Sequence, residues 1–409
     1  MKKRFWLLVL IAGILVATLL PLSSVAKAPD NIAPVKAEIV DLRQENSKTF
    51  DLGGRKKQLI VSMGAIHYKD DYASGEPWKD IDLTWQDNKI TKAPYELTLE
   101  GKKLTIRDKK SDEVSTIELL SVFPAGLNYE IIAENSAVRF RHTLPSEKIP
   151  FEANFKVNGK GLFTTKAFDD EGEIELETTV VGDILTEKVK KIVDKMTHKV
   201  RPAKGNIRID PTWQVGASTD DAFRRLVADY WGLSFNYLIA GADSAANYQY
   251  GCGMRFLNIT IPQGSTIDEA YFTLRSAFTS IGNVVNTRIS AEDVDDAATF
   301  ADDSAAFDTR WAARTTARVD WDDIDDWTAN VDYNSPECKT VEQELVDSPT
   351  WVSGGDQVWF WDDFEDRTAH TDLTRGAFSY DGSTTYCPQL VVSYTYTAPS
   401  TFVPRVEIW

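Results

Sequence analysis

The chain has few of the residues on which metal and catalytic sites usually depend. Its four histidines, His67, His142, His198 and His370, lie far apart, so no histidine-rich metal site is expected. No C-x-x-C pair is present, which argues against zinc. The sequence also lacks a Gly-x-Ser-x-Gly elbow, a P-loop, a Gly-x-Gly-x-x-Gly turn and a His-Glu-x-x-His motif. We therefore predict no catalytic residues and a protein that is not an enzyme.

Lysine is almost absent from residues 213–397, where Lys339 is the single example. This block has 30 acidic and 11 basic residues, a balance of −19, whereas the other 224 residues have 32 acidic and 34 basic residues, a balance of +2. Binding to nucleic acid needs clustered Lys and Arg, so the block is not expected to bind nucleic acid. Its acidity suits neutral ligands and divalent cations better.

Long apolar runs are absent except near the N-terminus. A basic stretch, Lys2-Lys3-Arg4, precedes apolar or small residues at 6–20, and Ser24-Val25-Ala26 offers a cleavage site. We interpret residues 1–28 as a signal peptide cut after Ala26, which predicts an extracellular or cell-surface protein. The alternative is a retained anchor, the one case in which a membrane contact is expected, although the apolar run is shorter than the roughly 20 residues of a membrane span.

Export would permit disulfides, but the chain has only three cysteines, Cys252, Cys338 and Cys387. Three cysteines allow three alternative single pairings, and each pairing leaves one thiol over. The sequence does not choose among them.

Residues 29–47 form a polar lead-in to a predicted β-rich domain at 48–205. Short runs of alternating apolar and polar residues, such as 95–99 and 103–106, are separated by Gly-containing turns, which is typical of antiparallel strands. Within residues 184–200 apolar residues recur at three- and four-residue steps opposite five lysines. This spacing predicts an amphipathic helix near the domain junction. We expect it to pack on a sheet, with binding to a membrane surface as the alternative.

Residues 206–397 form a second predicted β domain, followed by a tail at 398–409. Alternating runs at 255–261, 270–275, 286–291, 357–361 and 389–394 indicate strands. Ser335 and Pro336 are typical of a helix start, so one short helix is expected there. The chain is therefore predicted to be all-β, with two β domains, the second a jelly-roll-like sandwich.

Several stretches of the second domain resemble the DNRLRE-type, carbohydrate-binding-module-like β-sandwich of secreted bacterial and archaeal proteins. They are RFL at 255–257, IPQGSTI at 261–267, ISAEDVDDAATF at 289–300, YNSP at 333–336, AFSYDGS at 377–383 and PQLVV at 388–392. The segments GAIHYKD at 64–70 and WKDID at 78–82 resemble the β-rich region that precedes such modules in wall-associated repeat proteins. The resemblance implies surface binding or adhesion, often on polysaccharide, and implies no catalytic residues.

Acidic clusters follow two of the predicted strands and make them candidate calcium sites, since calcium takes six to eight oxygen ligands that loops can supply. The candidate ligands are Glu292, Asp293, Asp295, Asp362, Asp363 and Asp366. A third cluster, 322–326, lies between two tryptophans. The alternative is that these carboxylates are solvated or cap turns.

Aromatic side chains near turns are the second set of candidates, because sugar rings stack on flat aromatic faces. The candidates are Trp231, Tyr248, Tyr250, Trp327, Trp361 and Tyr386. The alternative for each is core packing. We therefore predict a secreted or cell-surface binding module for polysaccharide or a surface glycan. One alternative is a structural or adhesion component of an extracellular or phage-type assembly. Another is a polysaccharide-acting enzyme, which would need two facing carboxylates in a cleft.

Overall fold

The computed structural model describes residues 36–122, 127–159, 164–170, 172–195, 198–214, 218–227, 229–243, 248–282, 284–369 and 373–396. The predicted signal segment, 1–28, and the predicted tail, 398–409, lie outside these ranges. No helix in the described part has the length and apolar character needed to cross a membrane.

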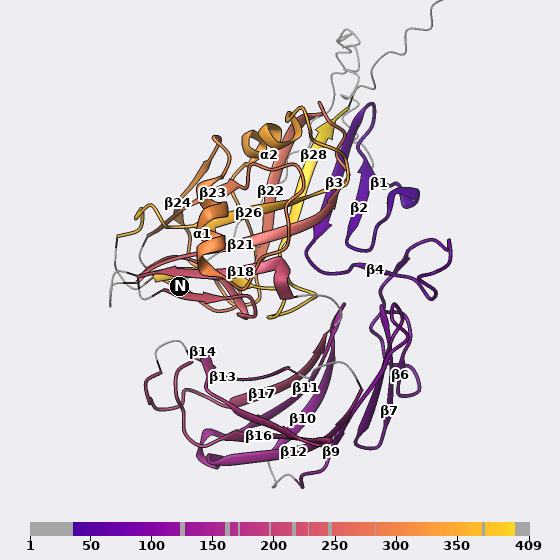
Figure 1. Ribbon diagram of the computed structural model, residues 1–409, viewed down its shortest axis with the longest axis vertical. Coiled ribbons are helices and arrows are strands. Elements are labelled where there is room, and N and C mark those ends of the chain that lie inside the picture. Colours follow the sequence, from indigo (N-terminus) through magenta and orange to yellow (C-terminus); the bar gives the residue numbers. More distant parts are fainter. Residues whose placement is uncertain are drawn as a thin grey trace, which may run out of the picture. The chain divides into compact units, whose positions relative to one another are not determined.

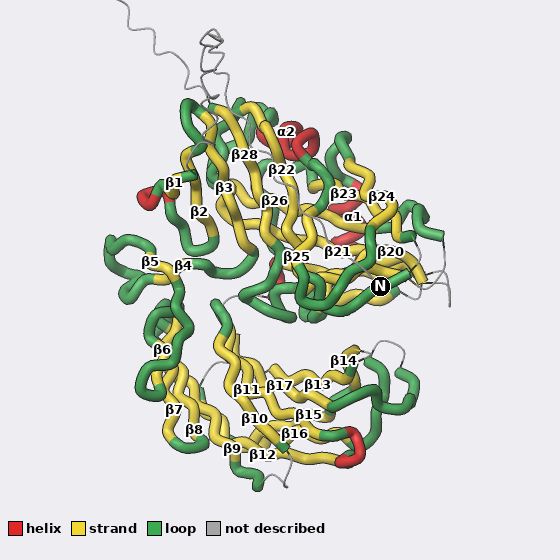
Figure 2. Tube along the Cα trace, turned by 180° about the vertical axis from the view of Figure 1, so that it is seen from behind, coloured by secondary structure: helices red, strands yellow, loops and turns green. Residues whose placement is uncertain are grey.

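The prediction of an all-β, multi-domain fold is confirmed, and strands make up most of the regular structure (Figure 2). Within the described ranges, the strands form four larger sheets and one two-stranded pair, and neighbouring strands are antiparallel throughout. Buried and exposed residues alternate along many of the strands, because successive side chains point to opposite faces of a sheet, whereas other strands are buried on both faces.

The first pair of sheets forms what we call the N-terminal sandwich. One sheet contains, in spatial order, β15 (Glu177–Val181), β16 (Ile184–Val189), β12 (Phe151–Asn158), β9 (Val114–Leu119), β8 (Lys103–Asp108), β7 (Tyr95–Glu100) and β6 (Lys89–Ile90). The facing sheet contains β10 (Asn128–Ala133), β11 (Ala137–Leu144), β17 (Ile207–Gln214), β13 (Thr164–Asp169) and β14 (Gly172–Ile174). Mostly aliphatic side chains, among them Leu97, Ile106 and Ile209, form the core between the sheets.

The second pair forms the C-terminal sandwich (Figure 1). One sheet contains β1 (Ala37–Glu38), β2 (Ser47–Asp51), β3 (Lys56–Ser62), β28 (Gln389–Thr395), β22 (Thr266–Arg275) and β25 (Asp332–Asn334). The other contains β19 (Tyr230–Gly232), β18 (Asp221–Leu226), β21 (Tyr248–Ile259), β26 (Gly355–Asp362), β23 (Val285–Ala291) and β24 (Val319–Ile324), with β20 (Tyr237–Asp243) and β27 (Leu373–Phe378) attached beside β21. Trp321, Trp327, Trp359 and Trp361 lie in its core.

At each end of the first predicted domain, one strand belongs to the other sandwich than the predicted boundaries imply. Strand β3 pairs with β28, so residues 37–62 belong to the C-terminal sandwich although they include part of the predicted lead-in. Strand β17 pairs with β11 and β13 of the N-terminal sandwich, although it lies beyond the predicted boundary at 205. The predicted ranges 48–205 and 206–397 therefore do not match the membership of the sheets. The remaining pair, β4 (His67–Tyr68) and β5 (Lys79–Asp80), lies in the connection that follows β3.

The predicted amphipathic helix at 184–200 is wrong. Residues 184–189 form strand β16, which pairs with β12 on one side and β15 on the other. Leu185, Glu187 and Val189 are buried and alternate with more exposed neighbours, a period of two that the apolar spacing also allowed. The turn at Gly182, whose φ of 64° suits glycine, makes β15 and β16 a hairpin.

Two α-helices are present in the described ranges, and both belong to the C-terminal region. Helix α1 (Ser304–Ala312) was not predicted; it begins after Asp303, whose carboxylate accepts from the backbone N–H of Ala305. Helix α2 (Lys339–Val346) confirms the predicted helix but begins later than Pro336. The hydroxyl of Ser335 instead accepts from the backbone N–H of Phe272. Short 3-10 turns occur at η1 (Val40–Leu42), η2 (Ser146–Lys148) and η3 (Ser218–Asp220).

The three cysteines are buried free thiols. None of the three pairings that the sequence allows is formed. Cys338 and Cys252 lie in the core of the C-terminal sandwich, and the Cys387 thiol is 3.7 Å from the hydroxyl of Ser62. Burial raises the pKa of Cys338 and Cys387 to about 12, so these thiols stay protonated and unreactive.

Candidate functional site

A basic row lies on the outer face of the five-stranded sheet of the N-terminal sandwich. On β11, Val138 and Phe140 face the core, so Arg139 and Arg141 point to the opposite face. Strand β17 repeats the pattern, because its isoleucines enter the core while Arg208 and Asp210 alternate with them. The antiparallel pairing of β11 and β17 brings these charged side chains together.

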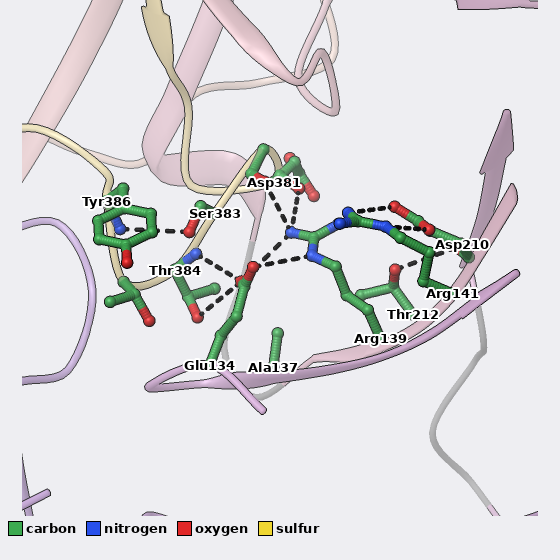
Figure 3. A network of polar contacts seen from close by, with 12 residues as sticks. Glu134, Ala137, Arg139, Arg141, Asp210, Thr212, Asp381, Ser383, Thr384 and Tyr386 are labelled. Atoms are coloured by element: carbon green, nitrogen blue, oxygen red, sulfur yellow. Dashed lines mark hydrogen bonds and ion pairs between the residues drawn. The ribbon is translucent and has the colours of Figure 1, made fainter. Parts of the chain in front are cut away.

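Two of these guanidinium groups have partners on their own sheet. Arg141 binds Asp210 through two parallel hydrogen bonds of 2.8 Å, one from Nε and one from Nη2 (Figure 3). Such a fork is the strongest geometry available to an Arg–carboxylate pair. Arg208 donates from Nη2 to the carbonyl oxygen of Asp169 (3.1 Å) and lies 3.9 Å from the Asp170 carboxylate. Arg208 is therefore held in place more loosely than Arg141.

Arg139 belongs to a buried network that joins the two sandwiches, which we call the latch: Glu134, Arg139 and residues 381–385. Arg139 Nε lies 3.0 Å from Glu134 Oε1, and its Nη2 donates to the carbonyl oxygens of Asp381 and Gly382 (Figure 3). The backbone N–H of Thr384 donates to Glu134 Oε2 (2.9 Å). Because both buried charges are paired and hydrogen-bonded, the latch can be stable away from water.

An aromatic cluster of the C-terminal sandwich lies near this basic row. Phe223, Ile239 and Tyr250 are its buried members, and half-buried aromatic side chains pack around them: Tyr230, Phe235, Tyr237, Tyr248 and Phe278. Tyr237 makes edge-to-face contacts with Phe235 (5.9 Å between ring centroids) and with Phe278 (5.5 Å). Gly376 leaves space for the Phe278 ring, since a Cβ at this glycine would collide with it.

Two cavities separate the basic row from the aromatic cluster. The small cavity has a volume of about 270 Å³, and the large cavity has a volume of about 690 Å³. Both are lined by Arg208, Tyr237, Ala277 and Asn330, so they are neighbouring parts of one cleft. The small cavity is further lined by Arg139, Arg141, Phe168, Asp210, Asn236, Phe378 and Gly382. The large cavity adds carboxylates and rings, namely Asp169, Asp170, Glu173, Asp194, Phe235 and Phe278.

Burial changes the titration of several groups in or beside the cleft. Desolvation raises the pKa of Glu173 and raises that of Asp381 to about 6. It also raises the pKa of Tyr237 to about 12, so the Tyr237 hydroxyl stays neutral. The amine of Lys166 donates to the Ser234 carbonyl and to Asn236 Oδ1, and its burial lowers its pKa. The cleft is thus a partly dehydrated site that contains both signs of charge.

Three of the predicted sugar-stacking residues are buried. Trp361 and Trp327 are 0% and 1% exposed, and their rings lie against each other at 5.7 Å in the core of the C-terminal sandwich. Tyr250, at 5% exposure, is a buried member of the aromatic cluster. The prediction that these three rings are stacking platforms is wrong, because neighbouring side chains cover them.

The other three predicted aromatic residues remain accessible. Tyr248 belongs to the aromatic cluster and packs against the guanidinium of Arg225 (4.2 Å). Trp231 packs on Phe307 of α1, and the ring of Tyr386, 45% exposed, lies under Arg275. Trp231, Tyr248 and Tyr386 line neither cavity of the cleft, and their contact with a ligand stays a prediction.

The predicted calcium ligands have protein partners in several cases. Glu292 binds the guanidinium of Arg310 through both carboxylate oxygens. Asp362 is buried and accepts from Trp311 Nε1 (2.9 Å), and burial raises its pKa to about 6. Asp363 accepts from the backbone N–H groups of residues 367 and 368. Asp293 and Asp366 are exposed and Asp295 is half-buried. In the part of the chain that the structure describes, no group of three or more acidic, His or Cys side chains is arranged to hold a metal ion.

The residues that line the cleft were not predicted from the sequence. The alternation along 137–144 and 207–214 was a usable signal, because each strand puts charged residues on the face opposite its core. An outer sheet face normally meets water, and nothing local in the sequence indicates that an aromatic cluster lies near it. The lining residues come from segments as far apart in sequence as Arg139 and Phe378, so their proximity could be found only from the structure.

Comparison with known proteins gives no family for this chain: no family model and no curated protein matches it. Among solved structures, a chain of the icosahedral IBDV viral particle aligns over 91% of this chain and 76% of its own, with 9% identity and a TM-score of 0.16. The N-terminal domain of the Streptococcus gordonii adhesin Sgo0707 aligns over 85% of this chain and 96% of its own, with 8% identity and a TM-score of 0.14. Similarity at this level does not support a functional assignment.

Proposed function

We propose that this chain is an exported, non-catalytic protein that binds polysaccharide in the cleft. The observation that carries the proposal is the pairing of aromatic rings with charged and amide side chains across the cleft. Tyr237 lines both cavities, with Phe278 beside it in the large cavity and Asn236 in the small one. Sugar rings combine apolar faces with hydroxyl groups, so their binding sites need both kinds of side chain.

The resemblance of the C-terminal region to the DNRLRE-type, carbohydrate-binding-module-like sandwich supports this proposal. The residues that carry the resemblance fall mainly in or beside strands β21, β22, β23, β27 and β28 of the C-terminal sandwich. The segment 377–383 overlaps the latch and adjoins the small cavity, where Phe378 and Gly382 are lining residues. We therefore propose membership in this group of exported surface modules and location outside the cell.

Binding without cleavage is proposed because two acidic side chains of the large cavity are already held in ion pairs. Arg201 lies within salt-bridge distance of both Asp169 and Asp194. A glycoside hydrolase needs one carboxylate as an acid and a second, facing one as a nucleophile or base. Glu173, whose pKa is raised by burial, is the residue to test as an acid. Release of reducing ends from a bound polysaccharide, lost in Glu173→Gln, would overturn the non-catalytic assignment.

The binding proposal is tested by retention of the chain on insoluble cell-wall and extracellular polysaccharides, followed by titration with soluble fragments of any polymer that retains it. Tyr237→Ala should weaken binding about tenfold, since loss of one stacking ring removes on the order of 1–2 kcal/mol. Tyr271→Ala is the matched control, because this half-buried tyrosine of β22 lines neither cavity. Equal affinities of the two variants would remove the cleft as the glycan site.

A structural or adhesion role without a small ligand is the competing function. In that case the chain would be retained on no polysaccharide and would self-associate as its concentration rises. Sedimentation at increasing concentration, with and without the retained polymer, separates the two functions.

A further inference from the structure

The small cavity has an unusual balance of charge for a protein whose net charge is −17. Three guanidinium groups, those of Arg139, Arg141 and Arg208, line it together with a single carboxylate, Asp210. All four belong to β11 and β17 of the N-terminal sandwich, the part of the molecule outside the strongly acidic block. Glu134 balances Arg139 and Asp210 balances Arg141, so Arg208, whose nearest carboxylate is 3.9 Å away, supplies the remaining positive charge of the cavity, and such a charge attracts anions.

The three arginines differ in what they can still bind. Arg139 is buried and is engaged with Glu134 and with two backbone carbonyls of the latch. Arg141 uses Nε and Nη2 for Asp210, and its Nη1 makes no hydrogen bond to a described residue. Arg208 uses only Nη2 toward Asp169, within the described ranges, and its side chain is 42% exposed. A guanidinium offers five N–H donors, so Arg141 and Arg208 retain donors for a ligand.

The large cavity has the opposite balance. Asp169, Asp170, Glu173 and Asp194 line it, against Arg208 and Lys195. Carboxylates accept hydrogen bonds from sugar hydroxyls but repel an acidic group. Since Arg208 lines both cavities, it marks the boundary between an end of the cleft that favours anions and an end that favours hydroxyl groups.

We infer that the small cavity is a subsite for the anionic group of an acidic sugar, with Arg208 and Arg141 as its donors, while the sugar rings extend along Tyr237 and Phe278 into the large cavity. This inference rests on the proposed function and specifies its ligand as an acidic polysaccharide. A uronate carboxylate fits the planar fork of a guanidinium directly. A sulfate ester presents the same charge and accepting oxygens, so the test must separate these two sources.

The test measures binding of the full chain to two matched pairs of polymers. One pair is polygalacturonate and the same polymer with its carboxylates reduced to primary alcohols. The other pair is dextran sulfate and dextran. The inference predicts that the anionic member binds at least about tenfold more tightly than its neutral partner, the effect of one charge-assisted contact. Arg208→Gln should abolish this preference, whereas Arg107→Gln, an exposed arginine of β8, should leave it intact.

The outcomes are distinct. Preference for polygalacturonate identifies a carboxylate subsite, and preference for dextran sulfate identifies a sulfate subsite; either supports the inference if Arg208→Gln removes the preference. Equal binding of charged and neutral partners overturns the anionic subsite but leaves polysaccharide binding in place. A preference that survives in Arg208→Gln, with an unchanged melting temperature of the variant, also overturns it. Lack of binding to all four polymers, and to every polysaccharide in the retention assay, removes the proposed function as well.

Discussion

The two sandwiches both bury apolar side chains between two sheets but differ in what fills the core. The N-terminal core is mainly aliphatic, and His142 of β11 and Glu187 of β16 meet in it at 3.1 Å. The C-terminal core contains several tryptophans, and Glu342 of α2 is buried there beside Gln357. One buried carboxyl therefore faces an imidazole and the other faces an amide. The Gln357 amide donates a hydrogen bond to Glu342 Oε1 (3.2 Å), whereas His142 lies within ion-pair distance of Glu187, where a protonated imidazole would balance a carboxylate.

The two sandwiches also differ in the charge of their outer surfaces. The acidic block at 213–397 makes up most of the C-terminal sandwich, whereas the N-terminal sandwich supplies the arginines of the cleft. The difference shows that net charge describes a domain but not a site, because a few side chains on one sheet face set the local potential.

The largest expected effect comes from the tryptophan core. Trp361→Ala should destabilise the chain by about 3–5 kcal/mol, because it opens a cavity in a well-packed interior and removes the ring that packs on Trp321 and Trp327. Urea unfolding followed by far-UV circular dichroism measures the loss. Tyr386→Ala, at an exposed ring, should stay within about 0.5 kcal/mol of the wild type. Comparable losses in the two variants would contradict the core assignment of Trp361.

Glu342 should make the C-terminal core sensitive to high pH. Burial raises its pKa from an ordinary 4.5 to about 8, so the neutral carboxyl is favoured in the folded chain. Stability from this group is fully present below pH 4.5 and is lost as pH rises through 8, at about 1.4 kcal/mol per unit of pKa shift, or about 5 kcal/mol in all. Glu342→Gln should remove this loss, since Gln can still accept from Gln357.

The measurement for Glu342 is the free energy of unfolding of wild type and Glu342→Gln between pH 4 and pH 9. The variant should be the more stable at pH 8 and above, and the two should converge near pH 4.5. Glu177→Gln, on the exposed strand β15, is the control and should follow the wild type throughout. Parallel curves for Glu342→Gln and wild type would show that this carboxyl is ionised in the folded chain.

The latch should couple the two sandwiches energetically. Arg139→Ala leaves Glu134 buried without its cation, which should cost about 3 kcal/mol. Calorimetry should then show a lower melting temperature, and tryptophan fluorescence, to which seven of the twelve tryptophans contribute from the C-terminal region, should no longer follow circular dichroism. Arg107→Ala, in an exposed ion pair, should leave both signals unchanged. Coincident, unshifted transitions in Arg139→Ala would show that the latch contributes nothing to coupling.

The smallest expected effect concerns calcium, which stays a prediction of the sequence. Binding of calcium to the folded state only would raise the free energy of unfolding by about 1.4 kcal/mol at a tenfold excess over Kd. Millimolar calcium should raise the melting temperature more than magnesium at matched ionic strength, and a chelator should reverse the shift. Asp293→Asn with Asp295→Asn tests the first cluster, and Asp362→Asn with Asp363→Asn tests the other. Equal shifts with calcium, magnesium and sodium salts would show screening of an acidic surface instead.

Much of the fold could be predicted because alternation is a local property. The strands at 95–100, 103–108, 266–275 and 389–395 all contain runs that the sequence predicted to be strands. The strand at 184–189 was not predicted, because its apolar positions fit the helical period near 3.6 as well as the strand period of two. In the strand, Glu187 is buried beside His142, which is 45 residues away in the sequence. Local spacing cannot resolve such a case.

The candidate site was less predictable, because an aromatic residue in a strand looks the same whether it is buried or exposed. Trp361 and Tyr237 both lie in or at strands of the C-terminal sandwich, yet one is in the core and the other lines the cleft. Which face of a strand is covered depends on the sheet packed against it. Sequence position near a turn was therefore a poor guide to exposure.

The sequence by itself determined the all-β class, the concentration of negative charge in residues 213–397 and the lack of familiar catalytic motifs, since all three follow from composition and short-range pattern. Only the tertiary structure decided that β3 completes the C-terminal sandwich, that β17 belongs to the N-terminal one, and that arginines of one sandwich line a cleft with aromatic rings of the other. The reason is physical: strand pairing and cavity formation depend on contacts between residues far apart in the chain, whose joint burial no local segment encodes.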